Sequence, residues 1–91
     1  HQGLFPVCLG GDHSITLALL RACYRYLGHA IPVVHFDAHP DTWTENWKMQ
    51  HGHGSFLYHA LKEGIVDGPN SVMIGVRCPI DTCTWEFTRH H

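Results

Sequence analysis

Charged residues are scarce in this sequence, and long apolar runs are absent. Asp, Glu, Lys and Arg make up 15% of the 91 residues, and the formal net charge is −2 with histidine counted as neutral. This balance excludes the strongly basic surface that marks a nucleic-acid-binding protein. There is no stretch of 18 apolar residues, no signal peptide and no lipidation motif, so the sequence predicts neither a membrane span nor a membrane anchor.

Cysteine is present, but no CxxC motif occurs. The four cysteines stand at positions 8, 23, 78 and 83. Cys8 and Cys23 lie inside expected apolar elements, where free cysteine is common, so we expect thiols and not disulfides. Thiols and the lack of a secretion signal indicate a reducing compartment. We therefore expect a cytoplasmic protein, or a mitochondrial one if a targeting segment has been lost.

The sequence is short and apolar for a free-standing domain, since 44% of its residues are hydrophobic. A chain of this length buries only roughly 60–65% of its unfolded surface and is marginally stable alone. It begins at His1 without an initiator Met and ends after Phe87-Thr88-Arg89 without a closing element. We therefore expect residues 1–91 to be part of one domain whose N- and C-terminal parts lie outside this sequence.

Short apolar runs alternate with helical periodicity. The runs 5–9, 31–36 and 71–76 predict three buried strands. Helical spacing predicts one helix that is capped by Asp12 or Ser14 and ends at Gly28, and a second that is capped by Ser55 and runs through Val66. A polar stretch, 38–54, predicts a long loop. Strand–helix alternation is typical of a parallel sheet with right-handed crossovers, so we expect a three-layer α/β/α fold.

Two polar motifs follow the first two expected strands. Gly10-Gly11-Asp12-His13 follows the first strand, and Asp37-Ala38-His39-Pro40-Asp41 follows the second. Ligands of open α/β sheets bind outside the carboxyl ends of the strands, so both motifs lie at the ligand-binding edge. Asp37, His39 and Asp41 alternate in an extended turn, and their side chains therefore point the same way. His13 joins them from the neighbouring strand end, whereas we expect surface or packing roles for the histidines at 1, 29, 35, 59, 90 and 91.

The donor types of this cluster indicate the class of metal. Two carboxylates and two imidazoles without a thiolate suit a borderline-hard divalent ion such as Mn²⁺ better than structural zinc. Clustered carboxylates repel one another, and cations remove that cost. Several carboxylates with more than one histidine suggest two ions, roughly 3.5–4 Å apart, that share a water and lower its pKa.

The same residues resemble the signatures of the ureohydrolase family, which contains arginases and agmatinases. Leu9-Gly10-Gly11-Asp12-His13-Ser14-Ile15-Thr16 resembles the first signature, and Phe36-Asp37-Ala38-His39-Pro40-Asp41-Thr42 resembles the second. His53-Gly54-Ser55 is similar to the His-Gly pair that precedes a helix in this family. Two further segments, 63–67 and 74–77, fit the agmatinase-like branch. The resemblance implies an arginase-like α/β/α fold, of which this chain is a part.

The resemblance also implies a role for each matching residue. His13 and Asp41 would bind the first manganese, His39 the second, and Asp37 would bridge both ions. A metal-bridging hydroxide would attack the guanidinium carbon of a small substrate and release urea and an amine. His53 would shuttle a proton, a role that contributes typically ~10²–10⁴-fold to rate. On the residues alone His51 is an alternative to His53.

One departure from the family pattern limits what this chain does by itself. The family completes its site with an Asp-x-Asp pair, one member of which is the second metal bridge, and this sequence contains no Asp-x-Asp. Asp81 stands alone. We therefore predict that the 91 residues alone are inactive. The resemblance further implies that the full-length protein forms homo-oligomers.

Substrate choice and two other classes of protein stay open. The stretch Trp43 to Gln50 does not resemble the segment with which arginases hold the amino-acid head group, which favours agmatine or guanidinobutyrate. Trp43 and Trp47 line the substrate entrance or pack within the loop. A binuclear metallophosphoesterase also uses Asp-x-His motifs, although in another order. A truncated, non-catalytic relative is the second alternative.

Overall fold

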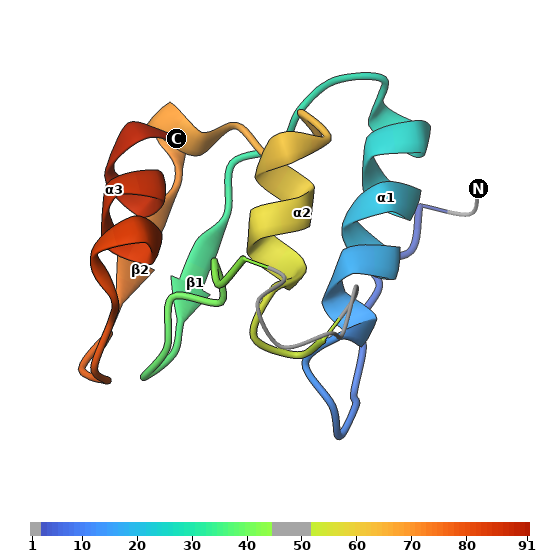
Figure 1. Cartoon of the computed structure of the whole chain (residues 1–91). Coiled ribbons are helices and arrows are strands. Elements are labelled where there is room, and N and C mark those ends of the chain that lie inside the picture. Colours follow the sequence, from blue (N-terminus) through green and yellow to red (C-terminus); the bar gives the residue numbers. More distant parts are fainter. Residues whose placement is uncertain (1–2, 45–51) are drawn as a thin grey trace.

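The computed structural model describes residues 3–44 and 52–91. Within them, helices and strands follow one another along the chain as α1 Ile15–Leu27, β1 Val34–Phe36, α2 Phe56–Lys62, the short 3₁₀ helix η1 Gly68–Asn70, β2 Val72–Ile74 and α3 Thr82–His90. Figure 1 shows α1 and α2 standing side by side, with β1, β2 and α3 on the other side of α2 from α1. The described residues include no helix that is long and apolar enough to cross a bilayer.

The two strands form a parallel pair. Val34 lies opposite Val72, and Phe36 lies opposite Ile74. A single bridge between Ile31 and Val66 extends the pairing ahead of both strands. Helix α2 belongs to the connection between the strands, as a parallel crossover requires. The expected strands at 31–36 and 71–76 are therefore present, although each is shorter than predicted.

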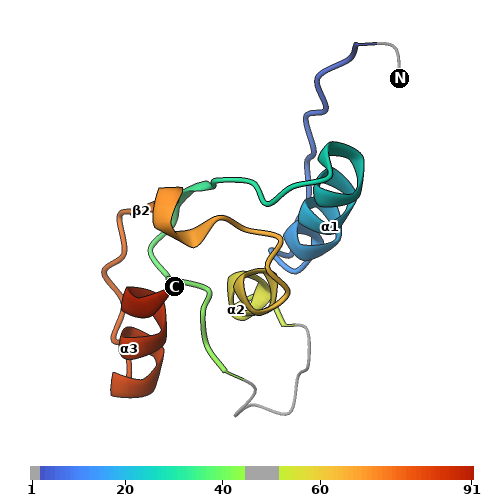
Figure 2. The same cartoon turned by 90° about the horizontal axis from the view of Figure 1, so that it is seen from above.

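The core lies between the strands and the helices. Its buried residues are Leu17, Phe56, Leu57, Ala60, Ile65 and Val66. Val33 of the strand segment and Met73 of β2 pack against this cluster. Figure 2 shows α2 and α3 on the same side of the strands. Strand residues that alternate with these two, such as Phe36 at 72% exposure, point away from the core. The described residues thus form two of the three layers that we expected.

Helix α1 ends as predicted. Gly28 adopts the left-handed conformation, with φ 77°, and its N–H donates to the carbonyl of Tyr24. Glycine adopts this conformation at little cost because it has no Cβ. The guanidinium of Arg21 then joins α1 to the chain that follows α2 through its ion pair with Glu63.

The predicted first strand, residues 5–9, is wrong for the described chain. Its residues form no strand pairing, and Phe5 and Leu9 are 89% and 93% exposed. An apolar run becomes a strand only where a neighbouring strand accepts its backbone hydrogen bonds. Cys8 is exposed for the same reason, although all four cysteines are free as expected.

The second helix is shorter than predicted. Helix α2 ends at Lys62, not at Val66, because Gly64 turns the chain with φ 68°. Ile65 and Val66 leave the helix and enter the core at 4% and 5% exposure. Periodicity alone does not separate apolar residues that continue a helix from those that turn back beneath it.

Helix α3 occurs where we expected no closing element. Asp81 begins it as the N-cap, because its carboxylate accepts the Thr84 N–H at 2.9 Å and the Thr84 hydroxyl at 2.7 Å. These hydrogen bonds, led by that of the backbone N–H, lower the pKa of Asp81. The aspartate that stood alone in the sequence therefore satisfies a free backbone donor of the helix.

Candidate metal centre

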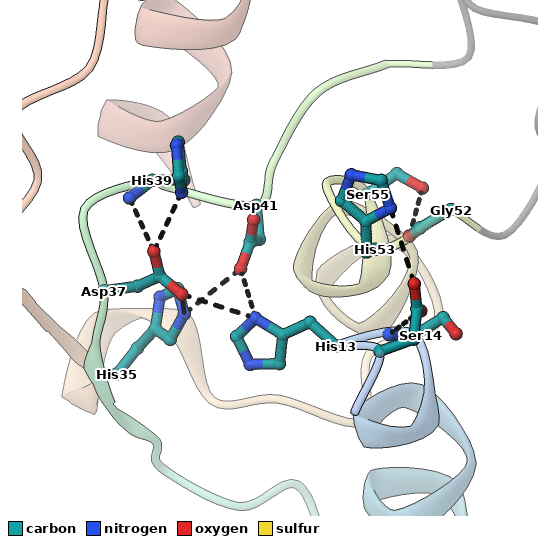
Figure 3. A network of polar contacts seen from close by, with 10 residues as sticks. His13, Ser14, His35, Asp37, His39, Asp41, Gly52, His53 and Ser55 are labelled. Carbon is teal, nitrogen blue, oxygen red and sulfur yellow. Dashed lines mark hydrogen bonds and ion pairs between the residues drawn. The ribbon is translucent and has the colours of Figure 1, made fainter. Parts of the chain in front are cut away.

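Three of the predicted ligands point toward one another at the end of β1 (Figure 3). Nδ1 of His13 lies 2.9 Å from Oδ2 of Asp41 and 3.4 Å from Oδ2 of Asp37. His13 comes from the segment before α1, whereas both aspartates come from the loop after β1. The chain thus brings together side chains from two separate motifs, as the positions of the motifs predicted.

Backbone hydrogen bonds hold the loop that carries the two aspartates. Asp37 continues the strand pairing, since its N–H donates to the carbonyl of Ile74. The carbonyl of Asp41 accepts from the N–H groups of Leu57 and Tyr58, at 3.0 and 3.2 Å. These donors belong to the first turn of α2, where N–H groups have no partner inside the helix. Asp41, and not the side chain of Ser55 that we expected, caps α2.

Asp41 adopts an unusual backbone conformation. Its φ is 52°, in the left-handed region, and it is the only non-glycine residue with positive φ among residues 3–44 and 52–91. Its side chain is only 5% exposed. Non-glycine residues in this region are uncommon and cluster at functional sites, where surrounding contacts hold them. The carbonyl that caps α2 supplies such a contact.

The fourth member of the cluster is His35, which we expected to be a surface or packing residue. Ligand atoms of His13, His35, Asp37 and Asp41 all lie within 4.8 Å of one another. Nε2 of His35 is 3.3 Å from Oδ2 of Asp41. A signal for this residue exists in the sequence, because His35, Asp37, His39 and Asp41 continue one alternation of period two from the strand into the loop.

His39 lies on the other side of Asp37. Its N–H donates to Oδ1 of Asp37 at 2.8 Å, and its Nδ1 lies 3.0 Å from the same oxygen. Its side chain is 54% exposed and is not one of the four converging groups. The two oxygens of Asp37 therefore face different histidines, His39 through Oδ1 and His13 through Oδ2.

His53 lies at the rim of the same site. A hollow of about 370 Å³ is lined by Gly11, Asp12, His13, Asp37, His39, Asp41 and His53. Nδ1 of His53 is 3.6 Å from Oδ2 of Asp12, and the His53 side chain is 67% exposed. The other oxygen of Asp12 accepts the Ser14 N–H at 2.8 Å. The Asp12 carboxylate thus bonds within the turn that precedes α1 and also faces His53, and the expected side-chain cap of α1 by Asp12 or Ser14 is not formed.

Of the remaining residues that the sequence singled out, Trp43 is described by the structure, whereas Trp47 and His51 are not. Trp43 is half-buried, and its ring lies 6.0 Å from that of His39. It also packs close to Gly54, which precedes α2. Packing of the loop, the simpler of the two roles proposed for Trp43, accounts for its contacts.

Hydrogen bonding favours an ionised carboxylate in this cluster. The His39 N–H, followed by the His39 side chain and the nearby imidazoles of His35 and His13, lowers the pKa of Asp37. Ionised carboxylates that converge with imidazole nitrogens form a suitable donor set for a divalent cation.

Buried polar atoms without partners also fit a cation here. Oδ2 of Asp41 and both ring nitrogens of His35 are buried and lack a hydrogen-bond partner within the described residues. The 2.9 Å approach of His13 to Asp41 is short enough for a hydrogen bond but is not aligned as one. Unpartnered buried groups are costly, and a shared cation would satisfy several at once. The residues therefore fit a metal.

The described chain thus has a parallel α/β fold with carboxylates and imidazoles gathered at a strand end, a donor set that could hold a metal ion. A family model described as the arginase family matches residues 1–91. The chain belongs to the arginase family.

Individual relatives agree with this assignment. Over 73 residues the chain is 48% identical to agmatinase from Proteus mirabilis, which covers 80% of this chain and 23% of that protein. The solved structure of a hypothetical agmatinase from Burkholderia thailandensis is 41% identical, with a TM-score of 0.71 over 80% of this chain and 23% of that one. An arginase from Medicago truncatula is 32% identical, with a TM-score of 0.89 over 98% of this chain and 27% of that one. These structures confirm the arginase-like α/β fold, of which the chain spans about a quarter of the length.

Proposed function

We propose that this chain is part of a metal-dependent hydrolase that cleaves a guanidino compound to urea and an amine. The observation that carries the proposal is the convergence of His13, His35, Asp37 and Asp41 within 4.8 Å, in a chain that the arginase family matches over residues 1–91. The relatives named agmatinase and arginase support the guanidino class of substrate.

We propose further that residues 1–91 supply one part of the catalytic domain. The chain covers 23% of the agmatinase from Proteus mirabilis and 27% of the arginase from Medicago truncatula. Its sequence lacks the Asp-x-Asp pair that the family resemblance requires. A second metal held by Asp37 and His39 alone would bind weakly, so activity requires donors from beyond these residues.

Two manganese ions are the cofactors that best suit these donors. His13 and Asp41 would hold one ion, His39 the other, and Asp37 would be shared. The two faces of Asp37 support its role, because Oδ2 lies 3.4 Å from His13 while Oδ1 lies 3.0 Å from His39. When bound, the ions lower the pKa of a water so that hydroxide is available near neutral pH.

His53 is positioned to transfer protons. Its ring borders the hollow and is 67% exposed, so it contacts both the site and bulk water. The Asp12 carboxylate, 3.6 Å from Nδ1, favours one orientation of the ring. Exchange of His53 for Asn, which cannot act as an acid or base near neutral pH, should lower the turnover number by about 10²–10⁴-fold.

The substrate we favour is agmatine or guanidinobutyrate. Relatives named agmatinase are 46–51% identical over 69–73 residues, whereas the arginase from Medicago truncatula is 32% identical. Turnover on agmatine, guanidinobutyrate and arginine by the complete gene product tests this choice. A preference for arginine would contradict it.

Urea release by the complete gene product, loaded with Mn²⁺, tests the proposed reaction. We expect urea from the wild type, a large loss in His13→Ala, and wild-type rates in the control His29→Ala, since His29 is exposed and remote from the hollow. The 91-residue piece should release none. Hydrolysis of an aryl phosphate without urea release would favour a phosphoesterase, and no turnover by a metal-loaded protein would favour a non-catalytic relative.

A further inference from the structure

We propose that His35 is a positioning residue of the metal centre, whose Nε2–H holds the Asp41 carboxylate in place for the metal. Loss of this N–H would then weaken metal binding. The inference rests on the proposed function, and it concerns a residue outside the ligand set that we proposed there.

The strand geometry of β1 places His35 on the inner face. Val34 and Phe36, its neighbours in the strand, are 62% and 72% exposed, whereas His35 is 7% exposed. Inner positions of a strand are normally apolar, because a buried polar group without a partner destabilises the fold. A histidine at this position needs a compensating interaction, and the metal centre is where its ring points (Figure 3).

Among the residues that the structure describes, His35 has two ion-pair partners, and both are aspartates of the loop after β1. Nε2 is 3.3 Å from Oδ2 of Asp41 and 3.9 Å from Oδ2 of Asp37. Nε2 of His35 and Oδ2 of Asp41 are close enough for a hydrogen bond but are not aligned for one. Neither atom has another hydrogen-bond partner in the described chain. Such hydrogen bonds are often poorly aligned without the ligand and tighten when it binds.

A single aromatic side chain holds both imidazoles of the cluster. Phe56, which is 2% exposed, meets His35 edge-on, with ring centroids 5.6 Å apart at 89°, and lies 4.5 Å from the ring of His13. The two imidazole rings are themselves 5.5 Å apart. Packing of this kind restricts the ring of His35 to orientations that keep Nε2 near Asp41.

Asp41 needs such a partner for its side chain. Its backbone is held through the carbonyl that caps α2, but that contact does not involve the carboxylate. His13 approaches Oδ2 at 2.9 Å and is itself a proposed ligand, so its lone pair is required by the metal. Among residues 3–44 and 52–91, His35 is the other histidine whose ring nitrogen lies near Oδ2 of Asp41, and it can act as the donor. Groups that hydrogen-bond a metal ligand commonly contribute about 10–100-fold to metal affinity.

Two amide substitutions separate the ring nitrogens. Glutamine places its amide nitrogen near the position of Nε2, whereas asparagine reaches only the position of Nδ1. We expect Mn²⁺ affinity near the wild-type value in His35→Gln and a loss of about 10–100-fold in His35→Asn and His35→Leu. The affinity is measured on the complete gene product from the electron paramagnetic resonance signal of free Mn²⁺ during titration.

Thermal unfolding without metal separates positioning from a merely structural role. His35→Leu replaces a buried, unpartnered ring by an apolar side chain, so the metal-free protein should unfold at the same temperature as wild type or higher. Leu57→Val is the control, because Leu57 is 4% exposed in the same core and offers no donor. It should lower the unfolding temperature and leave the Mn²⁺ affinity unchanged.

The Mn²⁺ affinities of the three His35 variants test the positioning role. Weaker binding in His35→Leu and His35→Asn with rescue in His35→Gln supports the proposal. Unchanged affinity in all three variants overturns it, as does an equal loss in all three. A loss of affinity that merely follows the loss of thermal stability, as the Leu57→Val comparison would reveal, overturns it too. If wild type fails to bind Mn²⁺, the proposed metal centre fails first, and this inference fails with it.

Discussion

Exchange of Asp41 for Asn should stabilise the metal-free protein while it abolishes tight metal binding. Asparagine keeps the size of the side chain and tolerates the left-handed backbone at φ 52°, so the loop should retain its shape. What changes is the charge. The wild-type carboxylate lies near that of Asp37, with the ligand oxygens no more than 4.8 Å apart.

The magnitude follows from that separation. Two like charges 4.8 Å apart repel by about 1 kcal/mol in a water-like medium and by about 3.5 kcal/mol at the effective dielectric near a protein surface. The amide also avoids the desolvation of a buried carboxylate, which acts in the same direction. We therefore expect a gain of about 1–3.5 kcal/mol in the free energy of unfolding without metal. Measurement at pH 8, where imidazole is generally neutral, keeps attraction from the histidines small.

Metal should reverse the order of the two proteins. Mn²⁺ at about 1,000 times its dissociation constant stabilises the wild type by about 4.1 kcal/mol, which exceeds the expected gain of the variant, whereas the variant has lost a ligand and gains little from the metal. Thermal unfolding of the complete gene product, with and without Mn²⁺, measures both effects. Asp67 does not line the hollow, so Asp67→Asn serves as the control. It should unfold at the wild-type temperature both with and without Mn²⁺. A metal-free Asp41→Asn protein that is less stable than wild type would refute the electrostatic reasoning.

Three further predictions concern the backbone and the caps around the site. Gly75→Ala should destabilise the protein by about 1–3 kcal/mol, because Gly75 has φ 96° and a Cβ there would lie 3.3 Å from the carbonyl oxygen of Asp37. Chemical denaturation measures this, and Gly64→Ala, with φ 68° and an open surrounding, isolates the contribution of φ alone. Asp81→Ala should lower the melting temperature by removing the cap of α3, whereas Asp81→Asn should retain most of it; equal losses would argue against capping. Because the His39 N–H lowers the pKa of Asp37, the stability that this carboxylate contributes is complete above its unfolded pKa and is lost as the pH falls through its folded pKa. Acid unfolding monitored by circular dichroism should therefore be less steep in metal-free Asp37→Asn, and an unchanged profile would contradict the assignment.

The sequence sufficed to predict the polar edge of the fold. The positions of His13, Asp37 and Asp41 after expected apolar runs led to one cluster, and the three side chains do converge. This works because glycine and aspartate end apolar runs for local reasons, and because parallel strands bring their carboxyl ends to one edge. His13 reached the cluster even though the run before it, residues 5–9, forms no strand.

The failures concern contacts that are distant in the sequence. Phe5 and Leu9 have a strand-like pattern, but a pattern does not supply the neighbouring strand that would pair with them. The end of α2 depends on the burial of Ile65 and Val66 beneath the helix, which no local spacing encodes. His35 was missed for a different reason. A lone histidine in an apolar strand is most often a core residue, and only the loop that folds back beside it gives Nε2 two carboxylates to face.

The loop that carries the proposed ligands is also a structural joint between helices. Asp41 caps α2 through its carbonyl, and the next residue, Thr42, is fully buried and hydrogen-bonded to Thr88 of α3 at 2.7 Å. Since the Thr88 hydroxyl donates to the carbonyl of Thr84, the Thr42 hydroxyl is the donor in that contact. Two consecutive loop residues thus connect α2 and α3, while the Asp41 side chain faces the metal site. A shift of either helix moves the carboxylate, so we expect metal affinity and the packing of α2 and α3 to be coupled, each reporting on the other.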